Sequence, residues 1–171
     1  MNIIIRHDDF DFRLQPQVYI ENHEKFIKAN LIETAVIQVT QDGRLPNIDP
    51  YLVSYMKKST HWNIQLHGWD HLEYDKMPYD QIIKDLGAAI QWIETVFEKR
   101  PYIWFPPWNR RNETMEKAAS FFNLIIDNES NDIRKFIRDM EAGSFDGHSV
   151  YFHLWNGSEA ELVDRMIELC K

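Results

Sequence analysis

The sequence predicts an α/β fold, a distorted (β/α) barrel of six to seven strands, and two observations lead to it. Short β-branched segments alternate with amphipathic segments along the whole chain, which is typical of a parallel sheet with right-handed crossovers. Polar residues follow five of the predicted strands, and in a barrel the carboxyl ends of the strands meet at one rim. An open doubly wound sheet would hold its outer strands too far apart for these residues to share a site, so the barrel is preferred.

The expected elements form a single domain over residues 1–171, a length sufficient to bury a core. Strands are expected at residues 2–6, 35–40, 62–66, 102–105, 124–127 and 149–154. Helices are expected at residues 18–29, 51–58, 79–98, 113–122, 132–141 and 159–170. Helix 79–98 has the clearest pattern, because its apolar residues recur at helical spacing and Pro101 follows its end.

Composition excludes several classes of partner. The net charge of −8 argues against binding to nucleic acid or to an anionic membrane, since both would favour clustered Lys and Arg. The single cysteine, Cys170, permits neither an intramolecular disulfide nor a cysteine metal cluster. The N-terminus shows no signal peptide, and no stretch approaches the ~20 apolar residues that span a bilayer. We therefore expect a cytoplasmic protein.

Two histidines four residues apart, His67 and His71, follow the apolar strand at 62–66. Their imidazoles can turn toward one point, and Gly68 between them allows a tight turn of the backbone close to a ligand. A carboxylate from another strand end would complete a two-His, one-carboxylate site that holds zinc or a similar ion and leaves a position for water. The alternative is a pair of histidines on a helix surface.

Two adjacent aspartates, Asp8 and Asp9, follow the first predicted strand. Neighbouring carboxylates repel each other, so they need a cation or several hydrogen bonds in compensation. This favours a role for them in the same site. A turn or a helix cap, for which Asp is also a favoured residue, is the alternative.

Two further segments reach the same rim. In Pro106-Pro107-Trp108-Asn109, the first backbone N–H after the two prolines belongs to Trp108, and we expect it to point into the site; a rigid turn with an aromatic lid is the alternative. His153 lies in an otherwise apolar strand and therefore needs a partner. It is either a satisfied core residue or a general acid that faces the rim.

In this order and spacing, these pieces resemble the polysaccharide deacetylase superfamily, the NodB-homology group that includes carbohydrate esterase family 4. The family's first motif, an aspartate pair after the first strand, is matched by Arg6-His7-Asp8-Asp9. Its second motif, His-x-x-x-His, is matched by His67-Gly68-Trp69-Asp70-His71. The third motif, an Arg-x-Pro-aromatic turn, is matched only in part, by Pro107-Trp108. The last motif, Leu-x-His on a late strand, is matched by Tyr151-Phe152-His153. The matched segments extend from residue 6 to residue 153.

The resemblance implies a NodB-like barrel in which Asp9, His67 and His71 bind a divalent metal. Zinc is the first expectation, with cobalt, nickel and iron as alternatives. The same resemblance makes Asp8 the catalytic base and His153 the general acid.

The resemblance also has departures. The arginine of the third motif, which braces the base, falls on Phe105, so Arg6, Arg110 or Arg111 would have to replace it. The serine or threonine after the first histidine of the second motif is Gly68. Arg6 and Asp70 are expected to lie next to the site residues and to orient them; for Asp70 these would be the imidazoles.

These observations predict a metal-dependent hydrolase that removes acetyl groups from an N-acetylated, or O-acetylated, carbohydrate. Pro107, Trp108 and Asn109 are expected to contact the substrate or its oxyanion. One alternative is a hydrolase of a non-sugar C–N bond on the same scaffold, and another is a carbohydrate-binding barrel without catalysis. Exposed aromatics such as Trp69, Trp108 and Trp155 fit either a substrate groove or a subunit interface.

Overall fold

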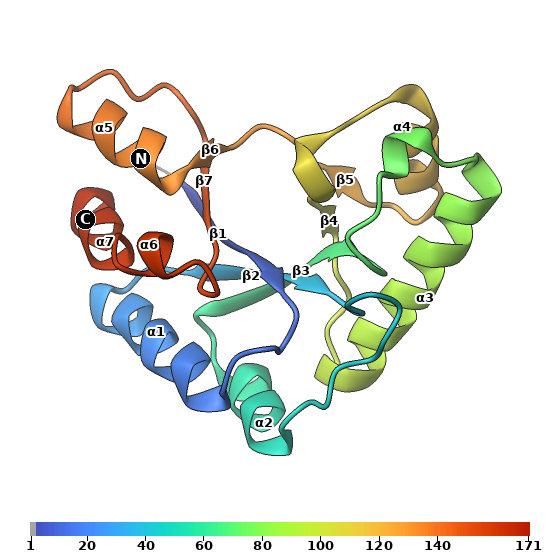
Figure 1. Cartoon of the computed structure of the whole chain (residues 1–171), viewed down its shortest axis with the longest axis horizontal. Helices are drawn as coiled ribbons and strands as arrows, with labels where there is room; N and C mark the ends of the chain where they lie inside the picture. The colour runs from blue at the N-terminus through green and yellow to red at the C-terminus, as the bar shows by residue number, and fades with distance from the viewer. Residues whose placement is uncertain (1–2) are drawn as a thin grey trace.

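The computed structural model describes residues 3–171 and shows seven parallel strands curled into a half-barrel, with helices around the outside (Figure 1). The strand order is β5-β4-β3-β2-β1-β7-β6, and all neighbouring pairs are parallel. The expected distorted (β/α) barrel is confirmed. It is open between its edge strands β5 and β6, which do not pair with each other.

The strands are β1 (Ile4–Phe10), β2 (Glu33–Gln38), β3 (Trp62–Gly68), β4 (Ile103–Trp104), β5 (Ile125–Ile126), β6 (Asn131–Asp132) and β7 (Ser149–Phe152). The helices are α1 (Pro16–Ala29), α2 (Pro50–Lys58), α3 (Tyr79–Phe97), α4 (Glu113–Phe121), α5 (Ile133–Glu141), α6 (Gly157–Ala160) and α7 (Val163–Cys170). Two short 3-10 helices, η1 (Tyr74–Lys76) and η2 (Pro107–Asn109), interrupt the loops after β3 and β4.

Several predicted elements differ from the observed ones. β1 continues to Phe10, so the aspartate pair lies within the strand and not after it; the predicted start at Asn2 lies outside the described residues. β6 is not predicted, because Asn131 and Asp132 are neither apolar nor β-branched. The helix predicted at 159–170 is divided into α6 and α7.

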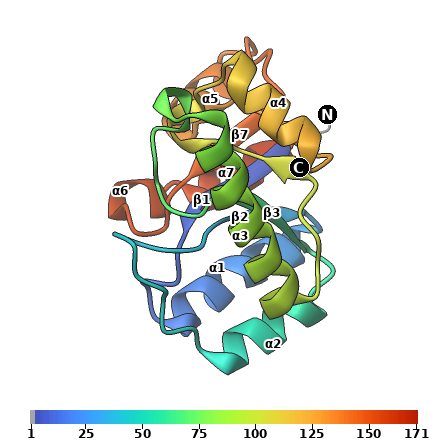
Figure 2. The same cartoon turned by 90° about the vertical axis from the view of Figure 1, so that its right-hand side faces the viewer.

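Burial of one face and capping of the ends stabilise the helices, as α3 and α2 show. In α3 the buried face includes Ile82, Leu86, Ile90 and Ile93, which repeat at helical spacing and pack into the core. Figure 2 shows α3 along the face turned to the viewer, over the strands. At the start of α2, the Asp49 carboxylate accepts hydrogen bonds from two backbone N–H groups. No helix of residues 3–171 is long and apolar enough to cross a bilayer.

The central strands determine where the polar residues meet. β2 is buried along its whole length, with β1 on one side and β3 on the other. Since the three strands are parallel, the carboxyl ends of β1 and β3 lie at the same rim. The end of β7, on the other side of β1, lies there as well.

Candidate metal centre

A cleft of about 240 Å³ lies at this rim. Its wall combines two carboxylates, three imidazoles, three aromatic or proline rings and one amide. These are Asp8, Asp9, His67, His71, Pro106, Trp108, Asn109, Tyr151 and His153. Seven of the site residues predicted from the sequence therefore line one cleft: Asp8, Asp9, His67, His71, Trp108, Asn109 and His153. Pro107 is buried and is not among the lining residues, its place being taken by Pro106.

Asp8 and Asp9 both line the cleft because β1 is irregular at its carboxyl end. In a regular strand, successive side chains point to opposite faces of the sheet. The register between β1 and β2 shifts between His7 and Phe10, and Asp9 has a φ of 51°. This irregularity, which has the character of a β-bulge, brings two adjacent carboxylates to one rim.

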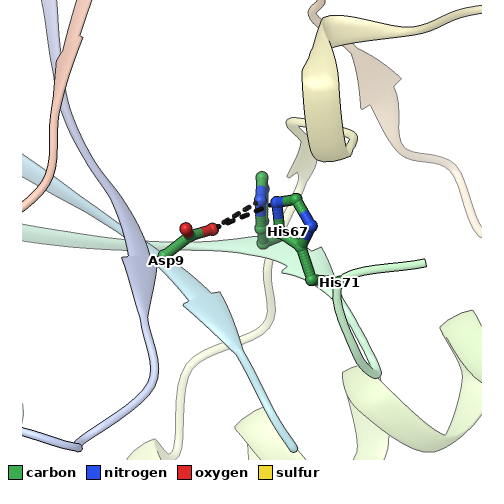
Figure 3. A group of neighbouring side chains, drawn as sticks. All are labelled: Asp9, His67 and His71. Atoms are coloured by element: carbon green, nitrogen blue, oxygen red, sulfur yellow. Dashed lines mark ion pairs between the residues drawn. The ribbon is translucent and has the colours of Figure 1, made fainter. Parts of the chain in front are cut away.

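Asp9, His67 and His71 form a group whose potential ligand atoms lie within 4.8 Å of one another (Figure 3). The Oδ1 atom of Asp9 is 3.1 Å from Nε2 of His67 and 3.4 Å from Nε2 of His71. Asp9 comes from β1, His67 from β3, and His71 from the loop that follows β3. One carboxylate oxygen and two imidazole nitrogens therefore face a common point.

The donor atoms of this group fit a metal ion. Oδ1 of Asp9 and Nε2 of His67 are buried, and neither has a hydrogen-bond partner among the described residues. Two buried polar atoms without partners are costly unless something else binds them. A divalent cation at the point that both face would satisfy both.

Hydrogen bonds, burial and neighbouring charges favour the protonation states in which His67, His71 and Asp9 can bind a cation. Nδ1 of His67 donates to the backbone carbonyl of Phe105 at 2.7 Å, which leaves Nε2 with its lone pair toward the group. Burial and the neighbouring His67 lower the pKa of His71, which favours the neutral form of the ring that binds a metal. Burial opposes ionisation of Asp9, but the nearby imidazoles hold the pKa of this carboxyl well below its ordinary value.

Gly68 makes room for a tyrosine behind the group formed by Asp9, His67 and His71. A Cβ atom at position 68 would lie 2.6 Å from the hydroxyl and 2.8 Å from Cε2 of Tyr74. The Tyr74 hydroxyl accepts a hydrogen bond from the backbone N–H of Trp69 at 2.9 Å. The buried Tyr74 ring thus occupies the space of a side chain at position 68 and holds the loop that carries His71.

Arg6 binds the carboxylate of Asp8 directly. Its Nε donates to Oδ1 at 3.1 Å and its Nη2 to Oδ2 at 2.5 Å, and the whole arginine is buried. The guanidinium carbon lies 4.3 Å from the centroid of the Phe105 ring. Phe105 stands where the resemblance places the motif-three arginine, so the cation comes from β1 and the aromatic ring stacks on it.

His153 is held by a residue that the sequence analysis missed. Its Nδ1 lies 2.8 Å from Oε2 of Glu159, and its backbone N–H donates to the same oxygen at 2.9 Å. Nε2 therefore faces the cleft, 3.7 Å from Oδ2 of Asp9. Burial alone would lower the pKa of His153, but Glu159 and the carboxylates Asp8 and Asp9 outweigh it and raise that pKa.

η2 shapes the opposite side of the cleft. Trp108 and Asn109 have φ values of 56° and 53°, which non-glycine residues adopt only where the surroundings hold them. The Trp108 ring lies 4.3 Å from that of His71, and Oδ1 of Asn109 accepts from Arg6 at 3.3 Å. Asn109 thus supports Arg6. That the Trp108 N–H binds an oxyanion stays a prediction.

Asp70 supports the site through the backbone and not through an imidazole. Its carboxylate accepts from the N–H of His71 at 2.7 Å and from the N–H of Gly43 at 2.7 Å. The side chain of Gln38 donates to it at 3.4 Å. Asp70 therefore ties the loop with the second histidine to the turn after β2.

Solved structures share this fold at low sequence identity. A family 4 carbohydrate esterase from Streptomyces lividans, in complex with acetate, matches with a TM-score of 0.77 and 14% identity, over 98% of this chain and 86% of that chain. The peptidoglycan deacetylase PdaC from Bacillus subtilis matches with a TM-score of 0.74 and 17% identity, over 97% and 81%. BA3943 from Bacillus anthracis, a family 4 pseudoenzyme, matches with a TM-score of 0.78 and 15% identity, over 98% and 60%.

The family model for polysaccharide deacetylase matches residues 17–125, well over half of the chain. No curated protein matches the sequence significantly. The matched range includes His67, His71 and the η2 segment, while the half-barrel matches the fold of the Streptomyces lividans esterase over nearly the whole chain. The chain belongs to the polysaccharide deacetylase family.

Proposed function

We propose that this protein is a metal-dependent deacetylase that hydrolyses the acetyl group of an N-acetylated, or O-acetylated, carbohydrate. The observation that carries the proposal is the convergence of Asp9, His67 and His71 on one point, where two buried donor atoms have no hydrogen-bond partner within residues 3–171. Asp8 and His153 line the same cleft. A base and an acid thus stand beside a site suited to a divalent cation.

The proposed cation is zinc, with cobalt, nickel and iron as alternatives for the same donor set. When bound, such an ion supplies Lewis acidity, which polarises an acyl carbonyl and lowers the pKa of water. Asp9, His67 and His71 are its proposed ligands. Asp8 is not one of them: it does not belong to the group of converging donor atoms, and its carboxylate is paired with Arg6.

The chain's own side chains move the protons in this mechanism. Asp8 accepts a proton from the attacking water, and Arg6 keeps its carboxylate oriented for that step. His153 gives its Nε2 proton to the departing nitrogen or oxygen, and Glu159 stabilises the imidazolium before transfer. The Trp108 N–H is the proposed donor to the developing oxyanion.

Two other functions compete with this proposal. A non-catalytic barrel has a precedent in the pseudoenzyme BA3943, but here the base, the acid and the three proposed ligands line one cleft. A hydrolase of a non-sugar C–N bond would use the same groups. Substrate comparison separates it: acetate release from N-acetylglucosamine oligomers supports the proposal, and turnover of cyclic amides alone overturns the carbohydrate assignment.

The first test is the metal content of the purified protein by inductively coupled plasma mass spectrometry. We expect near-stoichiometric metal in the wild type and in Asp8→Asn, and its loss in His67→Ala. Asp8→Asn should also abolish acetate release, a loss of about 10²–10⁴-fold for a general base. No metal in the wild type even after reconstitution would reject the mechanism, and full activity of Asp8→Asn would reject the base.

A further inference from the structure

A glutamate, a histidine and a serine form a hydrogen-bonded chain at the amino ends of the strands, opposite to the rim that holds the cleft. Oε2 of Glu33 lies 2.7 Å from Nδ1 of His23, and Nε2 of His23 lies 2.7 Å from Oγ of Ser59. Glu33 begins β2, His23 lies on α1, and Ser59 directly follows α2. The two helices are neighbours around the outside of the half-barrel (Figure 1), so three separate elements bring these side chains together.

The partners of the imidazole determine which of its nitrogens carries the proton. Burial opposes ionisation of Glu33, but the hydrogen bonds to His23 and His7 hold the pKa of this carboxyl below its ordinary 4.5. Nδ1 of His23 therefore donates to an ionised carboxylate, and Nε2 keeps a lone pair that accepts the hydroxyl proton of Ser59. The Trp62 ring stacks on the imidazole with 3.9 Å between centroids, which fixes the plane of the imidazole.

The serine is the member of this chain that solvent reaches. Glu33 and His23 are fully buried, whereas Ser59 is half-buried. The backbone N–H of His61 donates to Oγ of Ser59 at 3.2 Å, which holds the hydroxyl against the imidazole. A buried acid, an imidazole that it orients and an accessible hydroxyl are the arrangement by which serine hydrolases of unrelated folds activate a nucleophile.

We propose that Ser59, His23 and Glu33 form a second hydrolytic site, independent of metal, in which Ser59 is the nucleophile and the substrates are esters of small carboxylic acids. The backbone N–H of Thr60, the residue after the serine, makes no hydrogen bond within residues 3–171. The residue after the nucleophile supplies an oxyanion donor in many serine hydrolases, and Thr60 is the proposed donor here. This site does not depend on the function proposed for the cleft.

The surroundings of the serine favour this class of substrate. One N–H donor stabilises an oxyanion less than the usual pair, which favours esters over the less reactive amides. The residues that flank the serine, Lys58, Thr60 and His61, are polar, and the first two are exposed. Such a surface suits a small acyl group and not a long apolar chain.

The reaction balances with water as the only co-reactant. Oγ of Ser59 forms a bond with the carbonyl carbon of the ester while its proton passes to Nε2 of His23. The bond from that carbon to the alcohol oxygen breaks, and His23 returns the proton to the departing alkoxide. Water then attacks the acyl-serine, with His23 taking a proton from the water and giving it to Oγ as the carboxylic acid leaves.

A fluorophosphonate probe tests the nucleophile. Its phosphorus forms a bond with Oγ of Ser59, the P–F bond breaks, and fluoride leaves as His23 takes the hydroxyl proton. We expect one phosphonyl group per chain by intact-mass spectrometry, located on Ser59 by peptide mapping and unaffected by EDTA. Ser54, a half-buried serine on α2 without an imidazole partner within residues 3–171, should stay unlabelled. His23→Asn keeps a donor for Glu33 but has no Nε2, so labelling should slow at least about 10²-fold.

Ser59→Cys gives a readout that does not need His23→Asn to fold. A thiol against the same imidazole has a lowered pKa, so we expect iodoacetamide to alkylate it about tenfold faster at neutral pH than the thiol of Ser54→Cys. Cys170, present in both variants, gives the background. Equal alkylation rates in the two variants, a wild type that stays unlabelled, or labelling that persists in Ser59→Ala would overturn the nucleophile.

Ester turnover tests the reaction itself. Hydrolysis of para-nitrophenyl acetate is measured in the presence of EDTA, which removes any contribution from a metal in the cleft. We expect turnover in the wild type and its loss to background in Ser59→Ala. Equal turnover in the two proteins would overturn the hydrolytic site. Because a metal-free cleft is inactive under the proposed function, failure of either site is visible without reference to the other.

Discussion

Arg6 and Asp8 stand two residues apart on β1, and the guanidinium of the first binds both carboxylate oxygens of the second. The two side chains are buried, with the Phe105 ring stacked on the arginine. Residues two apart on a strand share a face, so the pairing follows from the strand itself. The cation that braces the proposed base is therefore encoded within the first motif, and the motif-three position is free to hold an aromatic residue.

This pairing predicts the effect of Arg6→Lys. Lysine keeps the positive charge but cannot form two parallel hydrogen bonds with a carboxylate. We expect kcat for acetate release to fall by about 10–100-fold, part of what the base contributes, with metal content unchanged. Arg111→Lys is the control, because Arg111 pairs with the exposed Glu116. If Arg6→Lys lost its metal, Arg6 would be a support of the metal site and not of the base.

Glu159 is predicted to act on catalysis through His153. Glu159→Gln keeps the shape of the side chain but removes the charge that stabilises the imidazolium. We expect kcat to fall at least about tenfold with little change in KM or metal content, and Glu159→Asp to recover part of it. Glu161→Gln, an exposed carboxylate at the end of the same helix, is the control. A loss confined to KM would contradict a role in proton transfer.

Periodicity and spacing were sufficient to predict the fold and most of the cleft. The helical repeat of α3 and the alternation of strands and helices indicate the half-barrel, because both patterns reflect burial along one face. The pair of His67 and His71 can also be recognised from the sequence, because both residues lie close together, at one strand end and in the loop that follows it. Whether these side chains bind a metal stays a prediction.

Contacts between separate segments could not be predicted in this way. Glu159 reaches His153 only because a tight turn folds α6 back over the end of β7, and no periodic signal marks that turn. Tyr74 fills the space beside Gly68 from η1, a contact that depends on the path of the whole loop. The sequence predicts that β1 ends at Arg6, four residues before its observed end at Phe10, because charged residues are unusual inside a buried strand.

The close approach of Tyr74 predicts that Gly68→Ala is destabilising. The new methyl group would lie 2.6 Å from the tyrosine hydroxyl, so the ring or the loop must shift. We expect a loss of about 1–3 kcal/mol in the free energy of unfolding, measured by urea denaturation, and weaker metal binding. Gly157→Ala, where a methyl group meets nothing within 4 Å, should have little effect. The double variant with Tyr74→Phe should lose less than the sum of the single changes.

A buried carboxylate away from the cleft predicts a pH-dependent contribution to stability. Glu33 is fully buried and contacts His7 Nδ1 at 3.0 Å and His23 Nδ1 at 2.7 Å. Burial alone would raise the pKa of Glu33, but the hydrogen bonds to His23 and His7 outweigh it and lower that pKa below its ordinary 4.5. A carboxyl whose pKa is lower in the folded state stabilises the fold above its unfolded pKa and loses that contribution as the pH falls through the folded pKa.

Glu33→Gln tests this contribution. The substitution removes the carboxylate charge that contacts both imidazoles, so we expect the free energy of unfolding to fall by about 3 kcal/mol at neutral pH. The gap between wild type and variant should stay constant down to a pH near 4.5 and shrink below it, because the wild type then protonates Glu33 as it unfolds. Glu21→Gln, an exposed change on α1, is the control. Urea denaturation at several pH values measures both effects, and a gap that widens in acid would contradict the lowered pKa of Glu33.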